Sequence, residues 1–242
     1  MTRDILLVHG SFHSGRCWDA LMDDLRADEW NPAVVTLPGH EARSGGRWSV
    51  RWSDYTEAVV RAARATPSGR PVVVGHSMGG HVVCGAVEAD PSAFSGVTFI
   101  SAAVAAPTGS TVLHMVVTDA MKRAVVPSAL KGTMRFRTGR AVDVFYNTCS
   151  AAVAVDAAAW LVPQPIRPIA RSRVVATEQG MGSMPLTYIE CLRDNALAID
   201  QQRAFQRQLR LADVVTIDSD HSPFLSARSE TVAALNRFWA AD

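Results

Sequence analysis

The most informative part of this chain is Pro71-Val72-Val73-Val74-Gly75-His76-Ser77-Met78-Gly79-Gly80. The apolar run before Gly75 predicts a buried strand, and the apolar spacing over 78–89 predicts a helix. A serine with a glycine two residues before it and another two residues after it fits a sharp turn that exposes the serine hydroxyl. Because Gly-x-Ser-x-Gly is a common pattern, the flanking strand and helix carry the prediction that Ser77 is a nucleophile.

Short runs rich in Val, Ile and Leu recur along the rest of the chain and alternate with segments of helical spacing. The expected strands are 4–8, 33–37, 71–75, 97–101, 186–190 and 213–217. The expected helices are 17–27, 53–65, 78–89, 199–210 and 229–240. This alternation predicts an α/β fold with a mostly parallel central sheet and helices on both faces. With 242 residues and 48% hydrophobic content, we expect one domain over 1–242.

The stretch 104–184 breaks the alternation between the core segments 1–103 and 185–242. It contains five prolines, a basic patch at 131–140 and amphipathic pieces around 112–124 and 141–161. Ligands of open α/β sheets bind at the carboxyl ends of the strands, so we expect a helical cap that roofs a pocket there. A decorative insertion or an oligomer surface is the alternative, and association into a homodimer therefore stays open.

The charge balance predicts a small-molecule partner, with no nucleic acid and no membrane. Lysine and arginine (24) nearly equal aspartate and glutamate (23), so no basic footprint for nucleic acid or an anionic surface is present. The run 5–8 is too short for a signal peptide, and no stretch reaches the ~18 apolar residues of a membrane span. We therefore expect a cytoplasmic protein.

The cysteines predict no metal site and no disulfide. Cys17, Cys84, Cys149 and Cys191 are widely scattered and form no Cys-x-x-Cys pair. Buried free thiols are the expected state.

A serine nucleophile needs a histidine base, and His221 is the best placed of seven histidines. It follows the last apolar strand and precedes the final helix, at the same strand-end level as Ser77. His76 adjoins the serine, but its side chain should point away from it. Structural roles are expected for the other three candidates considered, which are His40, His81 and His114.

The base needs a carboxylate, which should follow the preceding strand. Asp194 lies just beyond the run 186–190, whereas Glu190 falls inside it. Asp218 and Asp220 compete, but a residue so close to His221 rarely reaches the ring nitrogen opposite the serine. We therefore predict Asp194 as the acid.

The developing oxyanion needs backbone N–H donors, and two are predicted. Met78 supplies one on the turn, and Ser11 supplies the other in the loop after His9-Gly10. A phosphate-binding glycine loop is the alternative there, but neither Gly-x-Gly-x-x-Gly nor Gly-Lys-Ser/Thr is present.

Together these positions resemble the α/β-hydrolase superfamily, and more narrowly the branch of plant methyl esterases, salicylate-binding esterases and hydroxynitrile lyases with their bacterial relatives. The resemblance spans essentially the whole chain. It is carried by His9-Gly10-Ser11-Phe12-His13-Ser14-Gly15, Leu37-Pro38-Gly39-His40, the Ser77 stretch, Thr187-Tyr188-Ile189-Glu190-Cys191, Asp220-His221-Ser222-Pro223-Phe224 and, in the cap, Phe145-Tyr146-Asn147-Thr148-Cys149-Ser150 and Leu161-Val162-Pro163. It implies the triad Ser77, Asp194 and His221, an apolar pocket under the cap and no cofactor.

Two departures from the lyases of this branch favour ester hydrolysis. Those lyases have a threonine after the first-strand histidine and a lysine after the catalytic histidine, where this chain has Gly10 and Ser222. The resemblance therefore implies a serine carboxylic-ester hydrolase for a small, largely apolar ester. A lyase or biosynthetic cyclase, or a slow-turnover ligand sensor, remains the alternative.

Pocket walls are predicted mainly from aromatic residues near these motifs. The candidates are Phe12, His13, Met78, Phe145, Trp160 and Phe224. Core packing is the alternative role of each aromatic.

Overall fold

The computed structural model describes residues 3–41, 47–112, 117–137, 139–209, 211 and 213–239. Within them, six strands form one sheet in which every neighbouring pair is parallel. Their order in space is β2, β1, β3, β4, β8 and β9. The strands are β1 (Arg3–Val8), β2 (Trp30–Val35), β3 (Val72–His76), β4 (Gly96–Ile100), β8 (Leu186–Cys191) and β9 (Asp213–Ile217). The predicted parallel sheet is confirmed.

The edge strand β2 begins three residues earlier than the sequence indicated. Its pairing with β1 starts at Trp30, opposite Arg3, and continues through Pro32. Proline lacks the N–H that a central strand would donate, but an edge strand has one unpaired side that tolerates it. The proline therefore concealed the true start of this strand.

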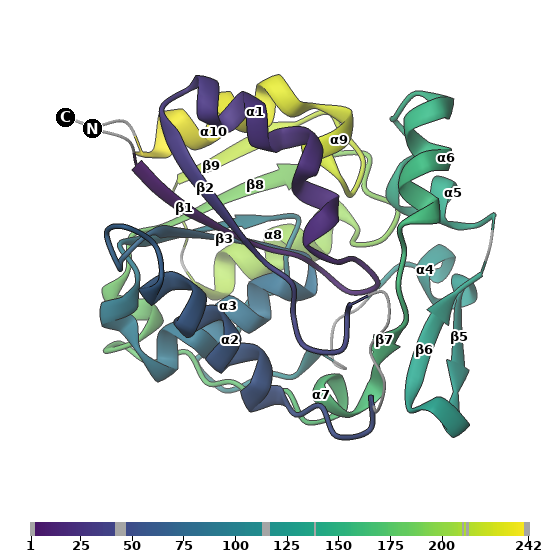
Figure 1. Cartoon of the computed structure of the whole chain (residues 1–242), viewed down its shortest axis with the longest axis horizontal. Helices are drawn as coiled ribbons and strands as arrows, with labels where there is room; N and C mark the ends of the chain where they lie inside the picture. The colour runs from purple at the N-terminus through teal and green to yellow at the C-terminus, as the bar shows by residue number, and fades with distance from the viewer. Residues whose placement is uncertain are drawn as a thin grey trace.

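Helices cover both faces of the sheet (Figure 1). One face carries α1 (Asp19–Ala27), α9 (Pro223–Ser226) and α10 (Arg228–Trp239). The other carries α2 (Trp52–Arg64), α3 (Met78–Ala89) and α8 (Ile199–Gln208). The α/β fold with two covered faces is thus confirmed.

Side chains alternate between these two cores because successive residues of a strand point to opposite faces. In β1, Ile5 and Leu7 pack with α1 and α10, whereas Leu6 and Val8 pack with α2 and α3. All four are fully buried, and each contributes about 1.5–3 kcal/mol relative to an exposed side chain. The two-sided burial explains the near-continuous apolar runs of the sequence.

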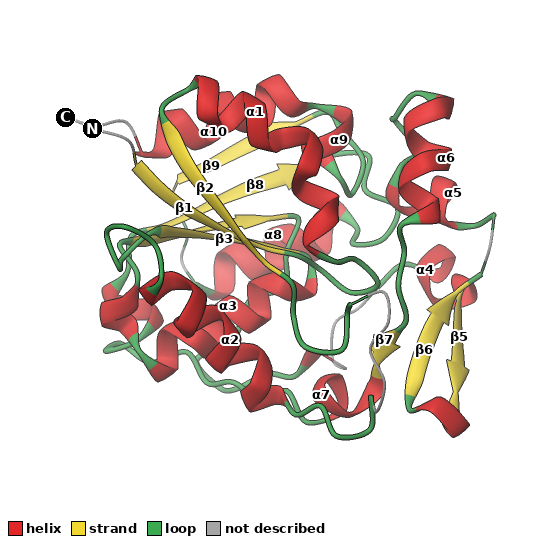
Figure 2. Ribbon diagram, in the orientation of Figure 1, coloured by secondary structure: helices red, strands yellow, loops and turns green. Residues whose placement is uncertain are grey.

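The segment 104–184, called the cap segment below, connects the neighbouring strands β4 and β8. Its helices and strands are α4 (Asp119–Ala124), β5 (Val125–Ser128), β6 (Thr133–Phe136), α5 (Ala141–Phe145), α6 (Ala151–Ala159), β7 (Gln164–Pro165) and α7 (Ile166–Ala170). The strands β5, β6 and β7 form a small antiparallel sheet beside the helices (Figure 2). This sheet is an addition to the helical cap that the sequence predicted, since its strands are too short to leave a periodic signal.

The parallel register brings the carboxyl ends of the strands to one edge of the sheet. Val8 of β1 lies opposite Gly75, and His76 of β3 lies opposite Ile100 of β4. The loops that follow these strands, and those that follow β8 and β9, therefore meet at that edge. No described helix is both long enough and apolar enough to cross a bilayer.

Candidate active site

Ser77 occupies the turn between β3 and α3, with φ of 55° and ψ of −124°. A positive φ is unfavourable for a residue with a side chain and is a mark of strained functional turns. The flanking glycines are required by packing. A Cβ on Gly75 would lie 2.6 Å from Gly80 Cα, and one on Gly79 would lie 2.6 Å from the His9 carbonyl oxygen. The structure thus forms the sharp strand–turn–helix unit that the sequence predicted.

His221 and Asp194 meet at the same edge of the sheet, although 27 residues separate them. Asp194 follows β8, and His221 lies between β9 and α9. The His221 Nδ1–H donates to Asp194 Oδ2 over 2.7 Å, and both side chains are buried. Since Nδ1 carries this hydrogen bond, the neutral ring presents Nε2 as its free base.

Backbone amides fix the Asp194 carboxylate in this orientation. Its second oxygen, Oδ1, accepts hydrogen bonds from the amides of Ala196 (2.7 Å) and Leu197 (2.8 Å). Gln202 of α8 adds a longer bond of 3.3 Å to Oδ2. The carboxylate is therefore held with Oδ2 toward His221.

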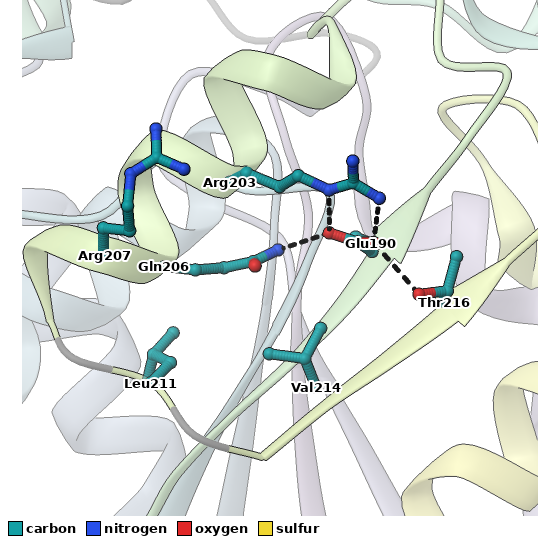
Figure 3. A pocket seen from close by; sticks show the side chains of 7 residues that line it. All are labelled: Glu190, Arg203, Gln206, Arg207, Leu211, Val214 and Thr216. Atoms are coloured by element: carbon teal, nitrogen blue, oxygen red, sulfur yellow. Dashed lines mark hydrogen bonds and ion pairs between the residues drawn. The ribbon is translucent and has the colours of Figure 1, made fainter.

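Glu190, the alternative acid on β8, points away to the α8 side of the sheet. Arg203 and Gln206 of α8 donate to its carboxylate, and Thr216 of β9 donates from the neighbouring strand, as Figure 3 shows. These donors lower the pKa of Glu190 against the opposing effect of burial. The hollow around it, about 650 Å³, is larger than the one at Ser77 but contains none of the predicted site residues.

Asp218 and Asp220 also have other partners. Asp218 forms an exposed ion pair with Arg193, with a shortest distance of 2.6 Å, and this pairing lowers its pKa. Asp220 is buried and accepts hydrogen bonds from the amides of Thr148 and Ser222. Of the four candidate acids, only Asp194 is bonded to the His221 ring among the described contacts.

A cavity of about 330 Å³ opens over Ser77 and contains both predicted oxyanion donors in its lining. Ser11, Met78, Ser77 and His221 line its floor. Met78 is the first residue of α3, so its amide has no acceptor within its own helix. Gly10 lies tightly against the nucleophile, because a Cβ there would lie 2.6 Å from Ser77 Cβ.

The cap segment provides most of the remaining lining. The residues from this segment are Val112, Val117, Met121, Lys122, Val125, Met134 and Ile169, and the core adds Phe12, Ala196 and Leu197. The amphipathic piece at 112–124 was a signal for some of them. Met134 and Ile169 carried no such signal, and none of the seven cap residues was predicted as a pocket wall.

Of the aromatic pocket walls predicted from the sequence, Phe12 lines the cavity, but four others do not. Phe145 is buried and stacks on His221, with ring centroids 5.5 Å apart. Phe224 packs behind the site against Trp18 and His76. Phe145 therefore supports the His221 ring from the cap segment, and Phe224 supports His76 from the core.

His13 and Trp160 were also predicted as pocket walls and also lie outside the cavity lining. The His13 Nδ1–H donates to the Ser11 carbonyl oxygen, and His13 Nε2 accepts from the Tyr146 hydroxyl, both over 2.8 Å. Burial lowers the pKa of His13 to about 4, so this ring is neutral. Trp160 lies under the Arg16 guanidinium, 4.4 Å from its ring centroid. His13 therefore braces the Ser11 loop, and Trp160 packs at the surface.

His76 turns away from Ser77, as expected, and has a supporting role that the sequence did not reveal. Its Nε2–H donates to the backbone carbonyl of His221 over 2.8 Å. Burial and the neighbouring His221 lower its pKa well below the usual value, so the ring is neutral. Through this bond, the residue before the nucleophile holds the loop of the predicted base.

The other histidines that the structure describes, and the cysteines, form no second candidate catalytic or metal site. His40 bonds to Gln164, His81 bonds to the Ser172 carbonyl, and His114 lies outside the described residues. The four cysteines are free thiols, and burial raises their pKa values, to about 12 for Cys84. Over the described part of the chain, no cluster of His, Cys, Asp or Glu could hold a metal ion.

Comparison with known proteins gives a family and related enzymes. Residues 5–235 match the alpha/beta hydrolase family. A pyrethroid hydrolase from Sphingobium wenxiniae is 26% identical over an alignment that covers 97% of this chain and 87% of that protein.

Solved structures match over nearly the full chain. The pyrethroid hydrolase from Sphingobium faniae is 25% identical, with a TM-score of 0.86 and coverage of 98% of this chain and 97% of that one. A methylesterase from Arabidopsis is 20% identical, with a TM-score of 0.82 and 98% coverage of both chains, and shares the fold.

Proposed function

The chain belongs to the alpha/beta hydrolase family and is an enzyme of the serine hydrolase class, and we propose that it hydrolyses carboxylic esters through an acyl-enzyme on Ser77. One observation carries the proposal. The His221 ring is bonded to Asp194 over 2.7 Å and lines the same cavity as Ser77, which sits in a strained turn. A base fixed by a carboxylate, on the same cavity as a serine hydroxyl, is the arrangement that acyl transfer requires.

In the proposed reaction, His221 Nε2 takes the Ser77 proton as Oγ attacks the ester carbonyl. Asp194 Oδ2 accepts from Nδ1–H and stabilises the imidazolium that forms. The proton then passes from Nε2 to the departing alkoxide, which leaves an acyl-enzyme. Water, deprotonated by the same ring, releases the carboxylic acid and restores Ser77.

The amides of Ser11 and Met78 are the proposed donors to the oxyanion. Loss of one such donor typically slows acyl transfer by about 100- to 1,000-fold. The His13 bond to the Ser11 carbonyl supports this assignment, because it fixes the peptide plane next to the proposed donor. Gly10 also supports it, because its missing side chain lets this loop approach Ser77 closely.

The cavity lining supports a small, largely apolar ester as substrate. Valine, methionine, isoleucine and leucine side chains form most of the wall, and Lys122 adds a charged group. The Sphingobium relatives are named pyrethroid hydrolases. A volume of about 330 Å³, near the lower end of the range of ligand pockets, favours a small ligand in this chain.

Ester hydrolysis is favoured over cyanide release by a lyase. Gly10 supplies no hydroxyl next to Ser77, and Ser222 is fully buried with no cationic group of its own. A departing cyanide would therefore find no cation on the residue after His221.

The test is labelling with a fluorophosphonate probe, followed by turnover of p-nitrophenyl esters of rising acyl length. The wild type should be labelled on Ser77 and should hydrolyse short esters. Ser77→Ala should lose both properties, whereas Ser92→Ala, in the 3-10 turn that follows α3, should keep them. A wild-type protein that is neither labelled nor active on any short ester would contradict the proposal.

A further inference from the structure

Ser101 is the first residue after β4, and β4 lies between the strands that lead to Ser77 and to Asp194. It is fully buried, and its φ is 40°, in the left-handed region that favours glycine. A serine that persists in this conformation marks a backbone held by its surroundings.

Backbone hydrogen bonds fix this turn to both neighbouring strands. The Ser101 amide donates to the Ile189 carbonyl of β8 over 2.9 Å. On the other side, the Ser77 amide donates to Ile100, and the Ala103 amide donates to Ser77. The position of the Ser101 side chain is therefore tied to the nucleophile and to the strand of the acid.

The Ser101 hydroxyl contacts both members of the acid–base pair. It donates to Asp194 Oδ2, the same oxygen that accepts the His221 Nδ1–H. Its Oγ also lies 3.3 Å from His221 Nδ1. Ser101 Oγ, Asp194 Oδ2 and His221 Nδ1 are thus in mutual contact, in a place from which water is excluded.

We propose that Ser101 is a positioning residue that holds Asp194 Oδ2 against His221 Nδ1, so that Nε2 faces Ser77 with its lone pair. The proposal rests on the proposed ester hydrolysis at Ser77. The amides of Ala196 and Leu197 fix Oδ1, and Gln202 adds only a long bond of 3.3 Å to Oδ2. The Ser101 hydroxyl is the closer of the two side-chain donors, apart from His221 itself, that restrain the oxygen facing the base.

The first test separates the hydroxyl from the backbone conformation. Ser101→Ala removes the hydroxyl and keeps a Cβ at positive φ, whereas Ser101→Gly removes the hydroxyl and also relieves the φ. On p-nitrophenyl acetate, both variants should lose about 5- to 30-fold in kcat, with KM within about twofold of the wild type. Ser101→Cys, which keeps the size and a weak donor, should be intermediate.

A double-mutant cycle then asks whether Ser101 acts through Asp194. In the Asp194→Ala background, Ser101→Ala should change kcat by less than about twofold, because the oxygen that it positions is gone. If Ser101 has only a structural role, Ser101→Ala should reduce kcat by the same factor in both backgrounds. Equal losses would overturn the proposal, and so would a Ser101→Ala variant with wild-type kcat.

Failure of this proposal can be told apart from failure of the proposed function. If the wild type hydrolyses esters and Ser77→Ala does not, the esterase assignment stands whatever Ser101→Ala does. Thermal unfolding of each variant guards against misfolding. A kcat that recovers in Ser101→Gly but not in Ser101→Ala would assign the effect to backbone strain and overturn the role of the hydroxyl.

Discussion

Thr148 and Asp220 exchange two hydrogen bonds between the cap segment and the loop that carries His221. The Thr148 amide donates to Asp220 Oδ2 over 2.9 Å, and the Asp220 amide donates to Thr148 Oγ1 over 3.1 Å. The other Asp220 oxygen accepts from the Ser222 amide and the Ser226 hydroxyl. One buried carboxylate therefore joins the roof of the cavity to the predicted base.

Replacement of Asp220 should destabilise the protein. Asp220→Ala leaves several buried donors unpaired and should lower the free energy of unfolding by about 3 kcal/mol, measured by urea denaturation. Thr148→Ser keeps the reciprocal hydroxyl and should remain within about 0.5 kcal/mol of the wild type. An Asp220→Ala variant as stable as the wild type would show that this link contributes nothing.

Asp194 and Glu190 can be compared as the two candidate acids of one region, because Glu190 lies on β8 and Asp194 lies in the loop after it. Asp194→Asn should reduce kcat by about 1,000-fold or more, because the amide cannot hold the Nδ1–H tautomer of His221. Glu190→Gln should weaken the bonds to Arg203 and lower stability by about 1–2 kcal/mol, with kcat within about twofold. Ester turnover and urea denaturation of both variants check this, and a reversed order of the two effects on kcat would refute the choice of acid.

Gly10→Ala should reduce kcat about tenfold or more. The added methyl would lie 2.6 Å from Ser77 Cβ, and both atoms are attached to backbone held by the sheet. Gly69→Ala is the control, because its φ of 63° costs about 1 kcal/mol of stability while its Cβ would meet only one atom, at 3.8 Å. Equal activity of the two variants would mean that the Ser11 loop can move away from Ser77.

Lowering the pH should reduce the free energy of unfolding, because the unfolded chain binds a proton at His13 more readily than the folded chain does. Burial lowers its pKa to about 4, against about 6.5 in the unfolded chain, so the unfolded state binds the proton first. The stabilisation is complete above pH ~6.5 and is lost as the pH falls toward ~4. Between about pH 7.5 and pH 5 the His13 contribution to the free energy of unfolding should fall by about 2 kcal/mol.

His13→Gln isolates this contribution from those of the other buried histidines. Urea denaturation at both pH values should give a stability loss about 2 kcal/mol smaller for the variant than for the wild type. If both proteins lose the same amount, His13 does not titrate in this range.

The sequence indicated the sheet, the strained turn and the three residues of the predicted triad because each left a local signal. The apolar runs of β1, β3 and β9 are bounded by turns, and parallel strands end at one edge, so Ser77, Asp194 and His221 could be brought together from chain order alone.

Other features of the site and of the cap segment depend on contacts between residues far apart in the sequence, which leave no local pattern. Ser101 is a single serine after β4, with no motif around it. Its proposed role depends on the position of β4 between β3 and β8. His13 and Phe145 lie in the motifs from which pocket walls were predicted, but buried partners decide which way each ring points. The strands β5 and β7 contain Pro127 and Pro165, which obscured the small sheet of the cap segment.

The cap segment leaves the core after β4 and returns at β8, and these two strands are hydrogen-bonded neighbours. An exchange of this segment for another would leave every strand pair of the central sheet intact. The cap segment that lines much of the cavity over Ser77 is therefore structurally separable from the central sheet that positions Ser77, Asp194 and His221. A replacement cap segment would need a hydrogen-bond donor for the Asp220 carboxylate, because Asp220 accepts a hydrogen bond from the cap segment next to His221.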